Sequence, residues 1–226
     1  MTNRPQTRRL MSSRKQMIAD SLFVVQIIAA ITFCGAYTLR SVTDVTGSSV
    51  AQFGLVVMFS GLNLALSIGA HRASPSRTTR QGIATYAVWI VLMLILIGVV
   101  STNSVYQWNE KDTTTLGTAL VLIVIVLVIA GMKKVSPNDP MMKGLLAVAF
   151  KSVPQVLLAW KFFAEGASGT PGLSIWVGHF CIIIRLGQIY FMVREAGWDR
   201  NRVWLAISEI SNGLSWIIAT AVWVFV

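Results

Sequence analysis

The sequence predicts an all-α integral membrane protein with seven transmembrane helices. Of its 226 residues, 54% are hydrophobic and only 12% are charged, whereas about a quarter of an ordinary soluble domain is charged. The mean hydropathy of +0.66 agrees with that composition. Seven apolar runs approach the length of about 20 residues that a helix needs to cross a hydrocarbon core of about 30 Å. This composition excludes a secreted disulfide scaffold, a disordered protein and a typical cytosolic enzyme.

The predicted spans are separated by short segments rich in turn-forming residues. The spans cover residues 17–39, 50–70, 82–100, 115–132, 141–163, 173–193 and 203–226. The segments between them include Ser74-Pro-Ser76, Ser136-Pro-Asn-Asp139, Gly169-Thr-Pro-Gly172 and Gly197-Trp-Asp-Arg-Asn201, and these residue types end helices and form turns. The first span is too long for the apolar core of a signal peptide, so we expect it to be retained.

The net charge of +10 is distributed unevenly, and this predicts the orientation. In a soluble protein such a charge suggests nucleic acid, but in a membrane chain bases collect in cytoplasmic loops, so we expect no nucleic-acid partner. One side holds fourteen bases: Arg4, Arg8, Arg9, Arg14, Lys15, Arg72, Arg77, Arg80, Lys133, Lys134, Lys143, Arg194, Arg200 and Arg202. The other side holds three, Arg40, Lys111 and Lys161. We expect a plasma (inner) membrane protein with its N-terminus in the cytoplasm and its C-terminus outside.

A weak internal repeat relates the first spans to the last ones. Phe23-Val-Val-Gln26, Thr46-Gly-Ser-Ser49 and Gly61-Leu-Asn-Leu64 correspond to Ser152-Val-Pro-Gln155, Thr170-Pro-Gly-Leu-Ser174 and Leu186-Gly-Gln-Ile-Tyr190. The offset is 129 residues between Gln26 and Gln155 and 125 between Ser49 and Ser174, so the halves align if one loop is four residues shorter. Transporters often contain such repeats, and their solute sites form where two repeats meet.

Two triplets with the same orientation need an inverting helix between them, because three spans leave the chain on the opposite side. The fourth run supplies one, since Thr118 is its only polar side chain between Leu116 and Gly131. We therefore expect parallel three-helix bundles arranged as 3+1+3. The divisions are a basic cytoplasmic lead (1–16), a first bundle (17–100), a linker helix with its flanking loops (101–135) and a second bundle (136–226). The lead also fits an organellar transit peptide, but we favour a cytoplasmic lead.

The segments Val153-Pro-Gln-Val156 and Gly172-Leu-Ser174, with Tyr190 and Asn212, resemble the PQ-loop superfamily, which includes the SWEET and SemiSWEET sugar transporters. The resemblance covers residues 151–225 best. It implies two parallel three-helix bundles joined by a linker helix, a solute path between them, a proline that lets its helix bend, and Asn and Trp side chains that contact the solute. The chain departs from the family at Val25, which corresponds to Pro154, and at Ser211, where SWEET proteins commonly have proline. Family members also place the N-terminus outside.

The substrate-binding candidates are amides and tryptophans inside the spans: Asn212, Trp216, Gln155, Trp176 and Asn63. Amides hydrogen-bond sugar hydroxyls or carboxylates, but they also hold transmembrane helices together without a ligand. Trp176, Trp216 and also Trp89 could stack on a sugar ring, although most tryptophans of a membrane chain form an interfacial belt. Pro154 removes a helical hydrogen bond; we predict a hinge there, with a static kink as the alternative.

Three ionisable residues lie deep in the predicted spans. Counted at 1.5 Å per residue from the basic side, Lys151 is ~15 Å deep, Arg185 ~12 Å and Glu209 ~9 Å, so the three can meet. An unpaired charge there costs about 2.5–3.5 kcal/mol, which favours an ion pair with Glu209. The pattern fits a hydrated cavity whose surplus cation attracts an anionic solute, or whose Glu209 accepts a coupling proton. It fits equally a structural salt bridge with Lys151 extended toward the interface.

These patterns favour a transporter that moves a small polar solute (a sugar, amino acid or small organic acid) by alternating access. The alternative is a non-transporting receptor or assembly factor on the same fold. We expect neither a retinal photoreceptor nor an enzyme: the last span lacks a lysine, no HExxH motif occurs, and Gly213-Leu-Ser-Trp-Ile217 departs from GxSxG. Cys34 and Cys181 imply neither a disulfide nor a metal site, and we expect no cofactor. The expected partners are the solute and the lipid bilayer; the sequence leaves a homo-oligomer open.

Overall fold

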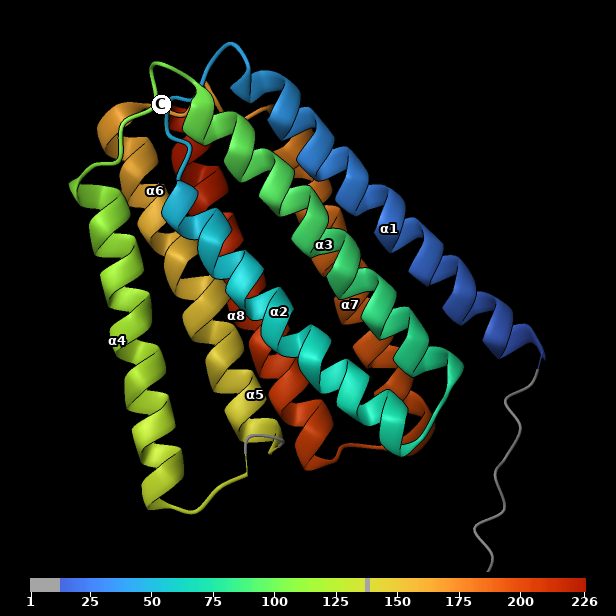
Figure 1. Cartoon of the computed structure of the whole chain (residues 1–226). Helices are drawn as coiled ribbons and strands as arrows, with labels where there is room; N and C mark the ends of the chain where they lie inside the picture. The colour runs from blue at the N-terminus through green and yellow to red at the C-terminus, as the bar shows by residue number, and fades with distance from the viewer. Residues whose placement is uncertain (1–12, 137–138) are drawn as a thin grey trace, which may run out of the picture.

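The computed structural model describes residues 13–136 and 139–226, and these contain seven long apolar helical spans (Figure 1). They are α1 (Ser13–Ser41), α2 (Val50–Ala73), α3 (Arg77–Thr102), α4 (Glu110–Met132), a fifth span made of α5 (Pro140–Ala147), η1 (Val148–Ser152) and α6 (Val153–Glu165), then α7 (Gly172–Ala196) and α8 (Arg200–Phe225). Each span is long and apolar enough to cross a membrane. This confirms the predicted all-α fold and the seven spans. Of the predicted lead 1–16, residues 1–12 lie outside the described residues, and α1 begins at Ser13.

The helices extend beyond most of the predicted spans because polar side chains cap them outside the apolar runs. Ser49, Asn109 and Asp199 accept hydrogen bonds from backbone N–H groups in the first turns of α2, α4 and α8. These donors have no partner inside the helix, so the caps stabilise the starts of the helices. Ser76 and Thr79 form a reciprocal capping box at the start of α3. Two of these caps, Ser76 and Asp199, belong to segments whose residue types predict turns.

The fifth span is interrupted near its middle by the π-helical turn η1. Pro154 follows this turn as the second residue of α6, and it lacks the backbone N–H that would bond to the turn before it. A π-turn contains one extra residue, so it relieves the steric conflict between a proline ring and the preceding turn. The predicted hinge residue thus lies at a local irregularity, and Lys151 belongs to the widened turn itself.

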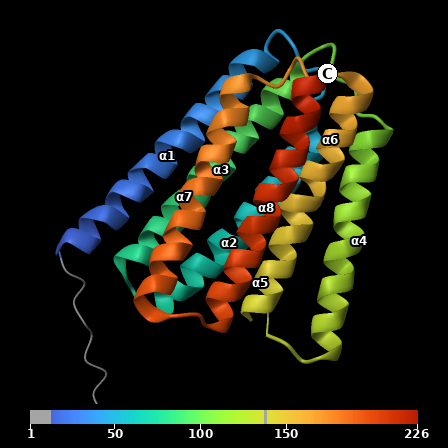
Figure 2. The ribbon, with the colours of Figure 1, turned by 180° about the vertical axis from the view of Figure 1, so that it is seen from behind.

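The helices pack in a reciprocal pattern. The α3 helix packs against both α1 and α2, and α8 packs against both the fifth span and α7. Between these groups, α1 packs against α7 and α2 packs against the fifth span. The α4 helix packs against α2 and the fifth span at one edge of the molecule (Figures 1 and 2). It leaves an exposed apolar stripe that includes Val121, Val124 and Val128, a surface suited to lipid.

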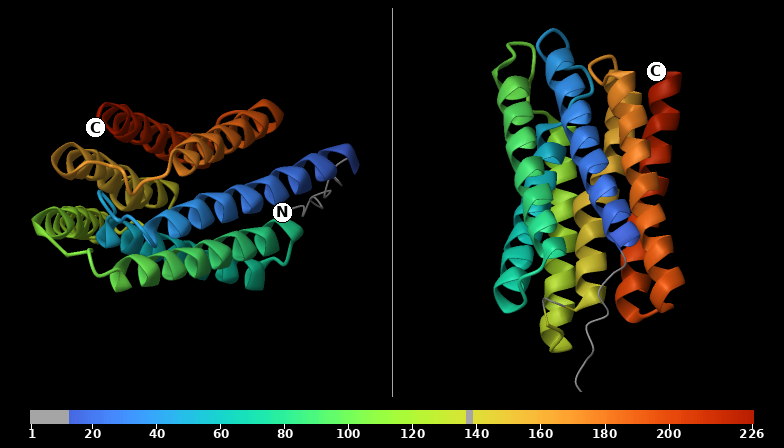
Figure 3. Two further views of the ribbon diagram at one scale, coloured as in Figure 1. Left: turned by 90° about the horizontal axis from the view of Figure 1, so that it is seen from above. Right: turned by 90° about the vertical axis from the view of Figure 1, so that its right-hand side faces the viewer.

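The two ends of the molecule differ in their charges. At one end, which we call the basic end, α1, α3, the fifth span and α8 begin, and the three loops there lie beside most of the bases that the sequence places on one side. At the other, the C-terminal end, α8 finishes beside the loops 42–49, 103–109 and 166–171 (Figure 3). All seven spans run between these two ends, so a residue's position along its helix gives its depth.

Candidate functional site

A cavity of about 750 Å³ lies between the helices. Its lining residues come from α1, α2, α3, the fifth span, α7 and α8; among the described residues, none comes from α4. Thr78, Lys143 and Asn201 line the cavity close to the basic end and are exposed. The cavity therefore opens at the basic end, and it separates α2 and α3 from α7 and α8 along part of their length.

The structure brings Lys151 and Glu209 together inside this cavity. Lys151 Nζ lies 3.1 Å from Glu209 Oε1, and the side chains are 17% and 8% exposed. The Lys151 ammonium also lies 5.2 Å from the centre of the Phe59 ring, a favourable position for a cation over an aromatic face. The Glu209 carboxylate is therefore neutralised by a neighbour on the fifth span, which lowers the cost of holding it at this depth.

A chain of side-chain hydrogen bonds continues from this ion pair along the junction of the fifth span and α8. Asn212 Nδ2 donates to Glu209 Oε2 at 3.4 Å, and Gln155 Nε2 donates to Asn212 Oδ1 at 3.1 Å. Ser215 Oγ then donates to Gln155 Oε1 at 2.5 Å. Both predicted amides thus join two helices while their residues line the cavity, so helix association and solute contact are compatible roles.

Arg185 lines the same cavity from α7. Its Nη1 donates a hydrogen bond of 2.9 Å to Gln188 Oε1, one turn further along the helix. Within the described residues no carboxylate lies within ion-pair distance of this guanidinium. We call Lys151, Arg185 and Glu209 the charged layer; it contains two cations and a single anion.

Three aromatic rings form a second layer, which we call the aromatic floor: Phe33, Trp89 and Trp216. All three line the cavity. The Phe33 ring centre lies 6.0 Å from that of Trp89 and 6.2 Å from that of Trp216, within the range of favourable aromatic pairs. Trp216 fits closely against Gly178, where an added Cβ would lie 2.7 Å from the indole. Phe33 was not predicted, although its spacing of seven residues from Gln26 places both on one helix face.

Asn63 and Trp176 differ from the other predicted site residues. Asn63 lines the cavity, but its Nδ2 donates to the backbone oxygen of Phe59 in its own helix at 2.8 Å. Trp176 is 67% exposed and lies outside the cavity lining. It shares its helix face with Leu173, Phe180 and Ile183, which are exposed apolar residues as well. A tryptophan on such a stripe suits the membrane interface.

Beyond the C-terminal end of the cavity, the end of α1 and the loop 42–49 contact the loop 166–171. Tyr37 and Thr170 share a side-chain hydrogen bond of 2.7 Å, and Arg40 Nε donates to the backbone oxygen of Ser168 at 2.9 Å. The backbone N–H of Gly169 donates to Thr46 O at 3.1 Å. A Cβ on Gly169 would lie 2.6 Å from Thr46 N, so only glycine permits this approach. We call these contacts the loop seal.

The Asp44 carboxylate braces the first of these loops. Partial burial acts to raise the pKa of Asp44, but hydrogen bonds from Thr46 and Ser168 and the nearby Arg40 guanidinium outweigh it, so the pKa is lower than usual. Asp44 accepts from Thr46 N at 2.9 Å and pairs with Arg40 Nη2 at 3.0 Å. The carboxylate is therefore ionised at neutral pH and holds the loop in the shape that meets Gly169.

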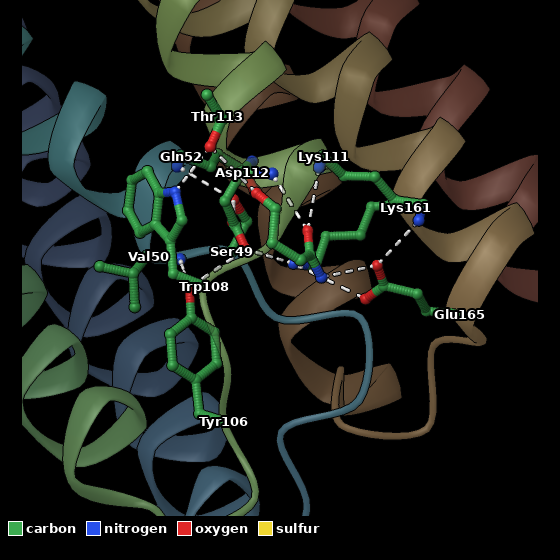
Figure 4. A network of polar contacts seen from close by, with 11 residues as sticks. Ser49, Val50, Gln52, Tyr106, Trp108, Lys111, Asp112, Thr113, Lys161 and Glu165 are labelled. Carbon is green, nitrogen blue, oxygen red and sulfur yellow. Dashed lines mark hydrogen bonds and ion pairs between the residues drawn. The ribbon is translucent and has the colours of Figure 1, made fainter.

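A buried ion pair lies beside the loop seal (Figure 4). Lys161 Nζ is 2.6 Å from Asp112 Oδ2, and their side chains are 3% and 0% exposed. Ser49 Oγ donates to Asp112 Oδ1 at 2.6 Å, and the Tyr106 hydroxyl donates to Oδ2 at 3.2 Å. Burial and the Asp112 charge raise the pKa of Tyr106, so the phenol keeps the proton that it donates.

The Lys161–Asp112 pair joins three parts of the chain. It connects the start of α2, the start of α4 and the end of the fifth span, and Glu165 at 3.6 Å extends it to Lys111 and Asn109. Lys161 lies at the C-terminal end, on the side where the charge count puts it, and it is buried because the fifth span continues as a helix to Glu165 and turns this side chain toward α4.

No group of His, Cys, Asp and Glu suited to a metal ion occurs in residues 13–136 and 139–226. Cys34 is buried, Cys181 lines the cavity, and both are free thiols. Comparisons of the chain with protein-family models, with curated proteins and with solved structures found no match.

Proposed function

We propose that the chain is a membrane transporter that moves a small polar solute by alternating access between two helix triplets. The observation that carries this proposal is the cavity with its charged layer. It opens at the basic end, it is lined from both triplets, and the loop seal joins the two triplets beyond its opposite end. A carrier that faces one side of the membrane needs these features, because the solute must reach its site from one side while the other stays closed.

The packing pattern supports the 3+1+3 arrangement. In each triplet the third helix packs against both others, and between triplets the first helix of one packs against the second of the other. The two loops of the seal also occupy equivalent positions, each between the first and second helices of its triplet. A pseudo-two-fold relation between α1–α3 and the fifth span, α7 and α8 accounts for all of these contacts, with α4 as the connector.

The fifth span supplies a place where the second triplet can bend. The π-turn η1 and Pro154 remove regular hydrogen bonds next to Lys151 and Gln155. The charged layer lies beside this irregularity, so bending there would move solute contacts and the helix together. The resemblance of Val153-Pro-Gln-Val156 to the PQ-loop superfamily points to the same role. The bias of the bases favours a cytoplasmic basic end, and hence a cavity open toward the cytoplasm.

Uptake into proteoliposomes tests the proposal. We expect the purified full chain to take up at least one labelled solute from a panel of sugars, amino acids and small organic acids. Trp216→Phe removes the indole that packs on Gly178 and donates to Ile175 O, and should lower the initial rate by about tenfold, the equivalent of ~1.4 kcal/mol.

The matched control is Trp176→Phe, the same change on the exposed face of α7, which should leave uptake within about twofold of wild type. Both variants should elute as folded protein in size-exclusion chromatography. Absence of uptake for the whole panel by folded protein would contradict the transporter proposal and favour the receptor or assembly factor.

A further inference from the structure

The cavity wall carries more positive than negative charge. The described lining residues include three bases, Lys143, Lys151 and Arg185, and one acid, Glu209. Lys143 is exposed at the mouth, whereas Lys151 and Arg185 lie deeper, and among the described residues Glu209 forms its ion pair with Lys151. The charge of Arg185 therefore has no carboxylate partner at ion-pair distance among the described residues. Charge of one sign in a cavity with low-dielectric walls focuses its field and concentrates the opposite ion.

The charged layer and the aromatic floor lie at a fixed separation. Arg185 follows Gly178, the residue against which Trp216 packs, by seven residues on α7. Glu209 precedes Trp216 by seven residues on α8, which runs in the opposite direction. Two turns of helix correspond to about 10 Å, and the two helices give the same distance independently. The amides of Gln155 and Asn212 lie between the layers.

We infer that the solute is an organic monocarboxylate whose carboxylate binds Arg185 and whose flat apolar body lies against the aromatic floor. The inference rests on the transporter proposal for its physiological meaning, but the binding site stands on its own. The planar guanidinium matches a carboxylate with two parallel hydrogen bonds. Its one side-chain partner in the described residues is the Gln188 amide, which an anion can displace.

Other solute classes fit these layers less well. A sugar or other neutral solute leaves the surplus cation uncompensated at a depth where an unpaired charge is costly. An organic cation meets Arg185 and Lys151 on its way to the floor. A small inorganic anion satisfies Arg185 but leaves Phe33, Trp89 and Trp216 without an apolar partner. A carboxylate carrying a single ring satisfies both layers.

Three probes of equal size and different charge test this: 3-phenylpropionate, 3-phenylpropionamide and 3-phenylpropylamine. Calorimetric titration into the purified full chain should give binding of the carboxylate at least about tenfold tighter than of the amide or the amine. Arg185→Gln should weaken carboxylate binding by about tenfold or more, and Arg185→Lys by less, because lysine keeps the charge without the fork. Glu209→Gln should tighten it, because the competing carboxylate is gone.

The control is Arg194→Gln, which removes an exposed base of the same helix outside the cavity lining and should leave binding unchanged. Arg185→Gln should not lower the melting temperature, whereas the loss of a structural arginine would. Equal affinity for carboxylate and amide, or unchanged carboxylate binding in Arg185→Gln, would overturn the inference.

Uptake separates this inference from the transporter proposal. Carboxylate binding that depends on Arg185, without carboxylate uptake in proteoliposomes, would support the anion site and contradict transport. Uptake of a neutral solute that persists in Arg185→Gln, with no binding of the carboxylate, would support transport and contradict the anion site.

Discussion

Lys161→Met is expected to lower the melting temperature (Tm) of the purified protein by roughly 6–20 °C, the equivalent of about 3–5 kcal/mol. The substitution removes the ammonium that lies 2.6 Å from Asp112 Oδ2, while Asp112 stays fully buried. Ser49 and Tyr106 still donate to the carboxylate, but neither carries a compensating charge. A buried carboxylate without a cation is one of the most costly groups that a single substitution can leave behind.

Arg77→Met is the matched control, because Arg77 Nη2 also lies 2.6 Å from a carboxylate oxygen, that of Asp20, yet Arg77 is 56% exposed. Solvent screens that pair, so its loss should cost about 0–1 kcal/mol. The double variant Lys161→Met with Asp112→Asn should recover most of the lost Tm, since the remaining side chains are neutral. Equal Tm losses in Lys161→Met and Arg77→Met, measured by thermal unfolding in detergent, would show that burial does not determine the strength of this pair.

The hydropathy pattern of this chain determines some properties of the fold and leaves others open. The number of spans follows from length and apolarity, and the starts of several helices follow from caps such as Ser76 and Asp199. Depth along a helix can also be predicted, because an α-helix rises 1.5 Å per residue. Lys151 and Glu209 were placed at compatible depths for this reason, and they form an ion pair.

The sequence is less informative about which face of a helix a side chain lies on and about where a helix departs from regular α-helical geometry. Trp176 and Trp216 have similar sequence surroundings, but one lies on the exposed face of α7 and the other in the aromatic floor. Asp112 and Lys161 each lie near a helix end, where a charge is normally solvated, and their pairing depends on how α4 packs against the fifth span. Pro154 indicated a bend, but a proline alone does not say whether a kink or a π-turn absorbs it.

Gly169→Ala should open the loop seal and abolish directional access to the cavity. The added Cβ would lie 2.6 Å from Thr46 N, 2.7 Å from Thr46 O and 2.8 Å from Val45 C. These are backbone atoms, which cannot move aside by changing a side-chain rotamer, so the loops 42–49 and 166–171 must separate. Separation also weakens the Gly169–Thr46 and Tyr37–Thr170 hydrogen bonds. The closed arrangement of this end should therefore lose population to arrangements in which it is open.

Cys181 provides a native reporter of this change, because it lines the cavity while Cys34 is buried. The assay uses a Cys34→Ser background and a membrane-impermeant thiol reagent, which is added to sealed vesicles of either orientation. Cys181 should be labelled at least about tenfold faster from the basic end than from the C-terminal end. A difference of ~1.4 kcal/mol between the two access barriers suffices for that ratio. Gly169→Ala should bring the two rates close to each other. Gly187→Ala, a glycine of α7 whose added Cβ meets nothing within 4 Å, should retain the one-sided labelling. One-sided labelling that persists in Gly169→Ala would show that the loop contacts do not close the cavity. It would contradict the closed C-terminal end on which the alternating-access proposal depends.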